Sequence, residues 1–227
     1  MKIAHLVSTF PPYHGGMGTV AWQLSKNLAD LGEEVTVLTP VAGNDTEEIV
    51  DGVQILRIHS GFRKGNASSC KWILKWLQGY DVIHLHWPFI GGAEWVWWGL
   101  YRRRLLNPQG FAPKLVIHYH MDLLAPGYRS IIFSLVDHWV LPRLFRLASA
   151  VVTTSSEYFD HSPTLQKIAK TTTSVYKSIP LGVDAGVFSP GAVRPFLREQ
   201  WSIDQGAAII GFVGSIDSAH YFKGIPQ

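Results

Sequence analysis

Cysteine is almost absent from this chain: its 227 residues contain a single one, Cys70. A disulfide framework is therefore excluded, and a reducing compartment such as the cytoplasm fits this composition best. Charged residues are scarce at 16%, and the sequence has no long block of one sign that would mark a disordered tail. The formal net charge of +3 favours anionic ligands or a membrane face and does not require nucleic acid.

Long apolar runs are missing as well. The most membrane-like stretch, WPFIGGAEWVWWGLY, is interrupted by Glu94 and three glycines, and a spanning helix needs roughly 20 apolar residues. The start, MKIAHLVSTFPP, is a poor signal peptide because His5 and the prolines cut its apolar stretch short. Zinc-finger spacing and RNP-type aromatic strands are absent too, so we expect no nucleic-acid partner. The expectation is a cytoplasmic protein, either soluble or bound peripherally at the inner face of the membrane.

The chain does contain short apolar runs that alternate with helical patterns. The runs are rich in Val and Ile and predict buried strands: KIAHLVS, EVTVLTP, VQILRI, DVIHLHW, KLVIHYH, AVVTTS, SVYKSIP and AIIGFVGS. Helical spacing predicts helices over residues 19–32, 68–79 and 129–147. This alternation predicts an α/β fold, a Rossmann-like parallel sheet with helices on both faces.

Composition changes near PLGVDAGVFSPGAVRP, where prolines and glycines interrupt the pattern. We therefore predict a first domain over residues 1–183 and a linker over 184–206, with a short helix near 196–201. Residues 207–227 then supply the first strand and turn of a second domain. A lone strand cannot bury its own apolar faces, so we expect the chain to be cut just inside that domain.

The glycine-rich segment HGGMG lies between the first predicted strand and the first predicted helix. In an open parallel sheet, ligands bind outside the carboxyl ends of the strands. A glycine-lined helix N-terminus there lets a phosphate or a sugar hydroxyl approach the backbone. Gly16, Gly18 and Ala21 also satisfy the dinucleotide fingerprint. However, STFPPYH replaces its tight turn and VLTP lacks its acidic residue, so a nicotinamide site is not expected. A plain surface turn remains the alternative.

Two histidine pairs end two of the apolar runs, in DVIHLHWP and LVIHYHMD. Positions i and i+2 of a strand point to the same side, so His84, His86, His118 and His120 could face one crevice. Four imidazoles suggest zinc, but the strand register is unknown and catalytic zinc more often has a nearby glutamate base. We expect no metal, and buried core histidines are the plain alternative. His120 stands out because Asp122 follows it where the strand should end, and such a pair can bind hydroxyls or exchange protons.

These motifs occur in the order seen in family 4 glycosyltransferases, the retaining enzymes of GT-B type. The segments that carry the resemblance are STFPPYHGGMGTVAWQLSKNLADLGEEVTVLTP, DVIHLHWP, VIHYHMDL, TSSEYF, IPLGVDAGVFSP and GFVGSIDSAHYFKGI. The chain resembles the N-terminal domain of such an enzyme plus the start of the C-terminal one. The resemblance implies two Rossmann-like domains, the first mainly for the acceptor and the second for a nucleotide-sugar donor.

The resemblance also implies roles for individual residues. Gly15 and Gly16 would lie against the donor's diphosphate and sugar, and His120 would contact the donor sugar near the reacting carbon, which makes it the catalytic candidate. Gly214 and Lys223 would bind the donor from the second domain. The residues implied on the acceptor side are His84, His86, Asp122 and Glu157.

Two departures from the family pattern concern the donor side. Ser215 follows Gly214 where many relatives carry an arginine, so more of the expected phosphate-binding charge falls on Lys223. The family's paired glutamates, spaced E-x7-E, do not occur in this sequence. We therefore expect this chain alone to show little or no transfer.

The activity implied is retaining transfer of a sugar from a nucleotide-sugar to a saccharide or lipid-linked acceptor, without cofactor or essential metal. The alternative is a non-catalytic carbohydrate- or lipid-binding module on the same scaffold. GGAEWVWWGLYRRR adds a second open question. It fits an interfacial helix on an anionic membrane, or tryptophans in the core followed by a solvated arginine-rich helix end.

Overall fold

A computed structural model describes most of the chain, over residues 1–13, 15–123, 127–191, 195–204, 206–211 and 214. Its contacts divide the chain into two compact units, Met1–Leu181 and Gly182–Gln227. This division lies close to the boundary predicted after residue 183. The assignments of 184–206 as a linker and 207–227 as the start of a second domain remain predictions.

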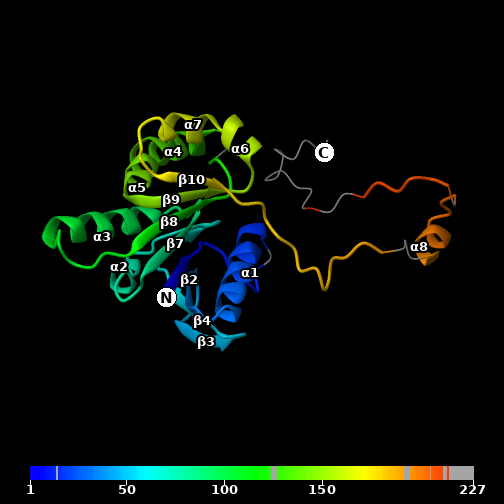
Figure 1. Ribbon diagram of the computed structural model, residues 1–227, viewed down its shortest axis with the longest axis horizontal. Coiled ribbons are helices and arrows are strands. Elements are labelled where there is room, and N and C mark those ends of the chain that lie inside the picture. Colours follow the sequence, from blue (N-terminus) through cyan, green and yellow to red (C-terminus); the bar gives the residue numbers. More distant parts are fainter. Residues whose placement is uncertain (14, 124–126, 192–194, 205, 212–213, 215–227) are drawn as a thin grey trace. The chain divides into compact units, whose positions relative to one another are not determined.

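The first unit contains an eight-stranded sheet with the order β10-β9-β8-β7-β1-β2-β4-β3 (Figure 1). Its strands are β1 (Lys2–Leu6), β2 (Glu34–Val41), β3 (Thr46–Val50), β4 (Val53–His59), β7 (Val82–Trp87), β8 (Lys114–Tyr119), β9 (Ala148–Thr153) and β10 (Val175–Ser178). All neighbours pair in parallel except the edge strand β3, which is antiparallel to β4. A separate short hairpin is formed by β5 (Arg63–Lys64) and β6 (Ala67–Ser68).

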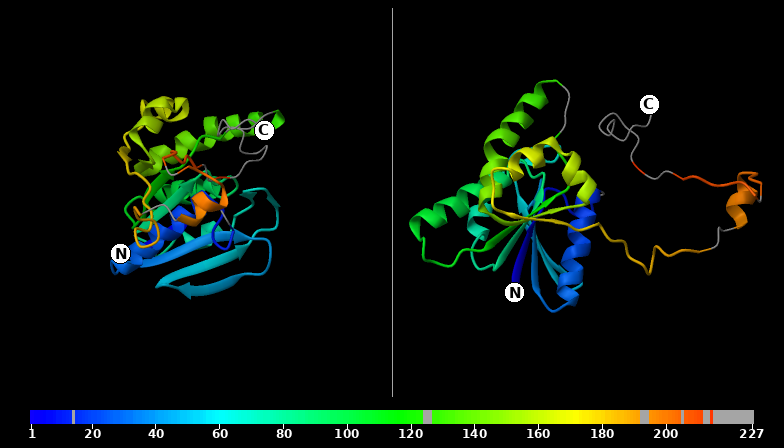
Figure 2. Two further views of the ribbon diagram at one scale, coloured as in Figure 1. Left: turned by 90° about the vertical axis from the view of Figure 1, so that its right-hand side faces the viewer. Right: turned by 45° about the horizontal axis from the view of Figure 1, so that its top comes forward.

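Helices cover both faces of this sheet, which confirms the predicted α/β fold class (Figure 2). The helices of the first unit are α1 (Gly16–Asp30), α2 (Ile73–Trp76), α3 (Ala93–Leu106), α4 (Tyr128–Leu135), the π-helix η1 (Val136–Val140), α5 (Leu141–Leu147), α6 (Ser156–His161) and α7 (Pro163–Ala169). The helix predicted over 129–147 is confirmed as the continuous run α4–η1–α5. In the second unit, α8 spans Pro195–Gln200.

The alternation of side chains along each strand divides the core in two. Leu6, Ile117 and Phe145 belong to the larger buried cluster, on the face that α3, α5 and α7 cover. Val7 and Val37 belong to the smaller cluster, on the face that α1 covers. Because the sheet is parallel, all the loops that follow its central strands leave at the same carboxyl edge.

Two predicted elements differ from the part of the chain that the structure describes. The helix expected over 68–79 is helical only at Ile73–Trp76, because Ser68 and Cys70 donate backbone hydrogen bonds to the loop between β7 and α3. The strand expected in AIIGFVGS does not form over its described residues 208–211. No described strand of the second unit pairs with it, and a lone strand leaves its N–H and C=O groups unpaired. Among the described helices, none is long and apolar enough to cross a bilayer.

Candidate functional site at the carboxyl edge of the sheet

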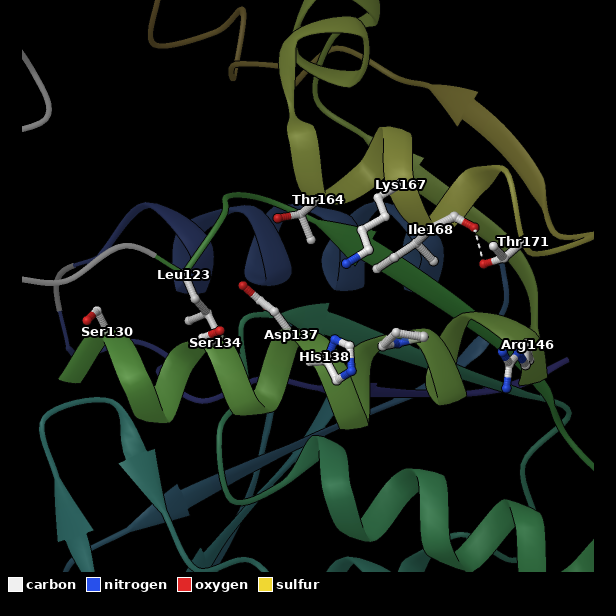
Figure 3. Close-up of a pocket in the computed structure, with 11 residues that line it drawn as sticks. Leu123, Ser130, Ser134, Asp137, His138, Arg146, Thr164, Lys167, Ile168 and Thr171 are labelled. Carbon is white, nitrogen blue, oxygen red and sulfur yellow. Dashed lines mark hydrogen bonds between the residues drawn. The ribbon is translucent and has the colours of Figure 1, made fainter. Parts of the chain in front are cut away.

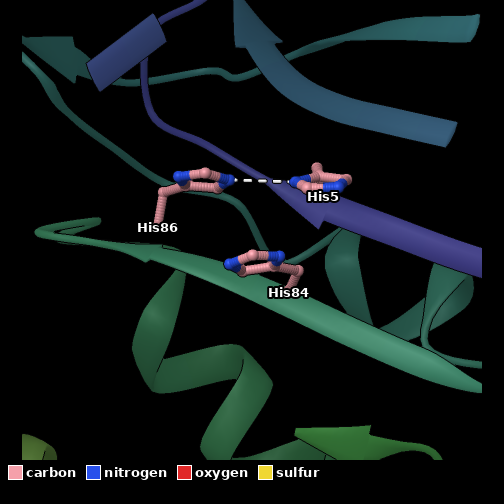
Figure 4. Close-up of side chains that lie close together, drawn as sticks. All are labelled: His5, His84 and His86. Carbon is pink, nitrogen blue, oxygen red and sulfur yellow. Dashed lines mark hydrogen bonds between the residues drawn. The ribbon is translucent and has the colours of Figure 1, made fainter. Parts of the chain in front are cut away.

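Histidines from three adjacent strands gather on the α1 face of the sheet. In the strand register, His5 of β1 lies opposite His84 of β7, and His86 lies opposite His118 of β8. The prediction that each pair shares one side is confirmed: the rings stack with centroids 4.8 Å apart for His84–His86 and 4.3 Å apart for His118–His120. We call these five residues the histidine cluster; three of them are seen in Figure 4.

Two hydrogen bonds link three members of the histidine cluster, His5, His86 and His120, in a row. Nδ1 of His5 lies 3.0 Å from Nε2 of His86, and Nδ1 of His86 lies 3.0 Å from Nε2 of His120. His5 and His86 are fully buried. His120 lies just beyond the end of β8, where its backbone N–H donates to the backbone carbonyl of Trp87. His5 could not be assigned to the site from the sequence, since a single histidine in an apolar run is informative only once the strand order is known.

Burial keeps the histidine cluster neutral. It lowers the pKa of His118 to about 4, and together with the neighbouring His118 it lowers the pKa values of His5 and His120 to about 3. The pKa values of His84 and His86 also lie well below the ordinary range, first because of desolvation and then because of the other histidines. At physiological pH each ring therefore carries one N–H and one lone pair.

The ring planes bear on whether the cluster could hold a metal. Two trios, His5–His84–His86 and His86–His118–His120, have ligand nitrogens within 4.8 Å of one another. An imidazole lone pair lies in the ring plane, so an ion must lie in the plane of every ring that binds it. Within the second trio the planes are only 5–18° apart, and the rings of His118 and His120 stack with centroids 4.3 Å apart. This arrangement fits edge-to-edge hydrogen bonding better than convergence on one ion, and the expectation of no metal remains a prediction.

The glycine-rich loop enters α1 at the same carboxyl edge. Gly15 is the N-cap of α1, and no side chain caps the helix there. A Cβ atom on Gly18 would lie 2.7 Å from the carbonyl oxygen of Thr9, whereas one on Gly16 would meet nothing within 4 Å. Gly18 is therefore required by the protein's own packing, and the space beside Gly16 is open. The long loop between Leu6 and Gly16 also confirms that the dinucleotide fingerprint lacks its tight turn.

Asp122 ties the loop after β8 to α6 and α7. Its Oδ1 atom accepts hydrogen bonds from the hydroxyls of Tyr119, at 2.6 Å, and Ser162, at 2.8 Å. Its backbone N–H donates to the hydroxyl of Tyr158 at 2.7 Å. Burial, followed by the Asp122 carboxylate, raises the pKa of Tyr158 to about 12. The Asp122 carboxylate thus helps to hold these segments together. Glu157, the neighbouring predicted acceptor residue, is exposed in the first turn of α6.

A groove of about 570 Å³ lies between the α4–η1–α5 run and α7 (Figure 3). It begins at Leu123, directly after Asp122, and its polar lining includes Ser130, Ser134, Asp137, Arg146, Thr164 and Lys167. The π-helix η1 presents Asp137 to this groove, and π-helical turns are frequent at functional sites. The Oδ1 atom of Asp137 is buried without a partner among the described residues, and burial raises the pKa of this carboxyl to about 7. Sequence reasoning missed Asp137; the only signal was a carboxylate inside the apolar run IIFSLVDHWVLP.

The structure brings some of the predicted site residues together and leaves others apart. His84, His86 and His120 share the histidine cluster, and Asp122 is hydrogen-bonded to the segment that carries Glu157. Gly15 and Gly16 begin α1 at the same edge of the sheet. Gly214 belongs to the second unit, and Ser215 and Lys223 lie outside the described residues.

Comparisons with known proteins agree with this architecture. The catalytic domain of starch synthase IV from Arabidopsis thaliana, bound to ADP and acarbose, matches with a TM-score of 0.60 and 15% sequence identity. The match covers 91% of this chain and 60% of that one, and at this identity it shows the fold alone. No curated protein sequence matches significantly. The profile of the glycosyl transferase 4-like domain matches residues 15–166, and the chain belongs to this family of glycosyltransferase domains.

Proposed function

We propose that this chain serves the transfer of a sugar from a nucleotide-sugar donor to a saccharide or lipid-linked acceptor, with retention of the anomeric configuration. The observation that carries the proposal is the carboxyl edge of the sheet. There the uncapped start of α1 follows β1, while His120 and Leu123, which lines the groove, follow β8, and both strands pair with β7. Two findings support a nucleotide diphosphate and a saccharide as ligands: the chain's family, and its similarity in fold to a starch synthase whose structure contains ADP and acarbose.

The donor's diphosphate would lie at the start of α1. The first N–H groups of a helix have no intrahelical partner, and the helix dipole places partial positive charge there. Thr19 donates the first helical hydrogen bond, to Gly15, so the N–H groups of residues 16–18 have no partner within the helix. The open space at Gly16 allows phosphate oxygens to approach this backbone. As the sugar departs, the diphosphate gains negative charge, and these N–H groups would stabilise it.

His120 would hold the donor sugar instead of attacking it. With its pKa lowered to about 3, its ring is neutral and suited to a hydrogen bond with a sugar hydroxyl. In the mechanism we propose, the acceptor hydroxyl attacks from the face that the diphosphate leaves, and its proton passes to the departing phosphate oxygen. No protein nucleophile is needed, and the configuration at the anomeric carbon is retained.

The groove beside Asp122 would hold the acceptor. Leu123, one of the residues that line it, lies three positions after His120 in the chain, which would bring an acceptor there near the donor sugar. Serine and threonine hydroxyls along the groove can exchange hydrogen bonds with sugar hydroxyls, and Arg146 and Lys167 add positive charge at its sides. Of the predicted acceptor residues, His86 is fully buried and cannot contact an acceptor as it stands, whereas His84 is half-buried.

A lipid-linked acceptor is supported by the outer surface of α3 and α4. Trp95 and Trp97 of α3 pack against the core, which agrees with the core reading of this stretch, but Trp98 remains 42% exposed. On α4 and η1, Ile131, Ile132, Leu135 and Trp139 are also exposed, and Arg143 stacks on Trp139 at 4.9 Å. Exposed apolar side chains beside arginines are typical of proteins that bind an anionic membrane surface peripherally.

The test is sugar transfer by the complete gene product, supplied with UDP-, GDP- and ADP-sugars and a panel of saccharide and lipid acceptors. We expect transfer from one donor class, and the His120→Ala variant should reduce turnover by at least about 100-fold if the ring positions the sugar. Normal turnover in His120→Ala would remove this residue from the site. Saccharide or lipid binding without any turnover would instead favour the non-catalytic module.

A further inference from the structure

The hydrogen bonds between His5, His86 and His120 restrict which ring nitrogens of these histidines can carry a proton. His86 is fully buried, and both its ring nitrogens are taken: Nε2 by His5 and Nδ1 by His120, each at 3.0 Å. A neutral imidazole has one N–H and one lone pair, so His86 must donate on one side and accept on the other. The direction of one hydrogen bond therefore dictates the direction of the other.

Only two arrangements satisfy both bonds. In the first, His5 and His86 donate through Nδ1–H, so His120 accepts at Nε2 and carries its own proton on Nδ1. In the second, His120 and His86 donate through Nε2–H, so the Nδ1 atom of His120 is a bare acceptor. A ring with the opposite tautomer would place two N–H groups or two lone pairs against each other in a buried site, which is strongly unfavourable.

We propose that His5 and His86 are positioning residues that fix the tautomer of His120, so that its Nδ1 atom meets a ligand with one defined hydrogen-bonding character. The chain of bonds exists independently of any ligand, but its use in holding a donor sugar rests on the function proposed above. Nδ1 is the ring nitrogen of His120 that is left unbonded by the chain. In the first arrangement Nδ1 of His120 would donate to a sugar hydroxyl, and in the second it would accept from one.

The other members of the histidine cluster provide matched controls. His118 stacks on His120 with centroids 4.3 Å apart, but both of its ring nitrogens are buried without a partner among the described residues. A phenyl ring at this position keeps the stacking and leaves the His5–His86–His120 chain intact. His118→Phe is therefore the control for His86→Gln, whose amide cannot maintain both bonds.

The experiment is long-range ¹H–¹⁵N correlation spectroscopy of the histidine rings in the ¹⁵N-labelled 227-residue protein at neutral pH, with EDTA present. Ring nitrogens with and without a proton have well-separated ¹⁵N shifts, so each tautomer is read directly. We expect His5, His86 and His120 to show one tautomer each, and all of the same sense, either all Nδ1–H or all Nε2–H. His118→Phe should leave the shifts of His120 in place, whereas His86→Gln should move them towards the values of an averaged mixture.

The wild-type spectrum decides the matter even if a variant fails to fold. Opposite senses within the three residues, averaged shifts for His120, or a charged ring would overturn the proposal. The proposal would also be overturned if replacing EDTA with one equivalent of zinc moved the ring ¹⁵N shifts to values typical of metal-bound histidine and broke the His5–His86–His120 hydrogen bonds. A fixed His120 tautomer together with no sugar transfer by the complete gene product would contradict only the proposed function. Transfer by the complete gene product together with averaged His120 shifts would contradict only this inference.

Discussion

Gly18 lies against the backbone of the loop before α1, while Gly16 faces open space. A methyl group on Gly18 would come within 2.7 Å of a carbonyl oxygen, which belongs to backbone that cannot easily move aside. A methyl group on Gly16 meets no protein atom within 4 Å. The sequence pattern alone cannot separate these two reasons for glycine, because both residues belong to HGGMG.

We therefore expect Gly18→Ala to destabilise the fold by about 1–3 kcal/mol, the range typical of overpacking. Gly16→Ala should change the free energy of unfolding by no more than about 0.5 kcal/mol, like an ordinary surface substitution. Urea unfolding followed by circular dichroism would measure both. Equal losses of stability for the two variants would show that position 16 is packed as tightly as position 18.

Stacked neutral histidines make strands β1, β7 and β8 sensitive to acid. The folded-state pKa of each cluster histidine is depressed, to about 3 for His5 and His120 and to about 4 for His118. Below the ordinary histidine pKa of about 6.5, the unfolded chain binds protons that the folded chain cannot accept. The stability that these residues contribute is thus fully present above that pH and is lost as the pH falls below it.

Each such histidine should reduce stability by up to about 1.4 kcal/mol per pH unit below pH 6.5. His84→Phe removes one of them and keeps an aromatic ring in the stack, so its loss of stability between pH 6.5 and 5 should be shallower than that of the wild type. His161→Gln, which changes an exposed histidine of α6, should follow the wild type. Urea titrations at several pH values give these slopes, and identical slopes for all three proteins would show that His84 ionises freely in the folded state.

The exposed apolar side chains of α4 define a second element-scale expectation. Ile131 is 64% exposed and Leu135 is 54% exposed, and both lie on the helical run that also carries Trp139 and Arg143. We expect the protein to co-sediment with vesicles containing anionic lipid, and the double variant Ile131→Ser/Leu135→Ser to reduce binding several-fold. Raising the salt concentration should weaken binding further.

The matched control for that experiment is Ile49→Ser, which removes a 74% exposed side chain from the edge strand β3. It should leave vesicle binding unchanged, because β3 lies at one end of the sheet and α4 follows β8 nearer the other. A loss of binding equal to that of the double variant would indicate general hydrophobic adsorption. Absence of any salt-sensitive vesicle binding would contradict peripheral binding of the protein to an anionic membrane.

At the scale of the whole molecule, the parallel sheet was predictable because each buried strand is an apolar run with turn residues on both sides. The edge strand TEEIV was not, since all its side chains are exposed and polar residues dominate it. Spacing correctly paired His84 with His86 and His118 with His120, but it could not reveal that His5 adjoins them. That contact depends on β1 lying next to β7, and strand order is set by tertiary packing and not by local pattern.

The groove escaped prediction for a similar reason. Asp137 lies in a helix and Lys167 in another, and no local spacing connects them. Within the first unit the family resemblance correctly implied the fold, whereas the roles that it implied for His120 and the other site residues stay predictions. Among the described residues of the second unit, which include Gly214, none forms a strand, and Lys223 lies outside them. The donor-side roles of Gly214 and Lys223 therefore also remain predictions.

The central claim is that the carboxyl edge of this sheet binds an activated sugar through the start of α1 and through His120. Its most direct test is a titration of the ¹⁵N-labelled chain with UDP-, GDP- and ADP-sugars at millimolar concentration, followed through the backbone amides and the histidine rings. The account predicts that at least one of these donors shifts the amides of residues 15–18 together with the ring of His120, while Gly32, at the far end of α1, stays in place. Shifts confined to other regions for every donor, or shifts at α1 with His120 unmoved, would contradict it.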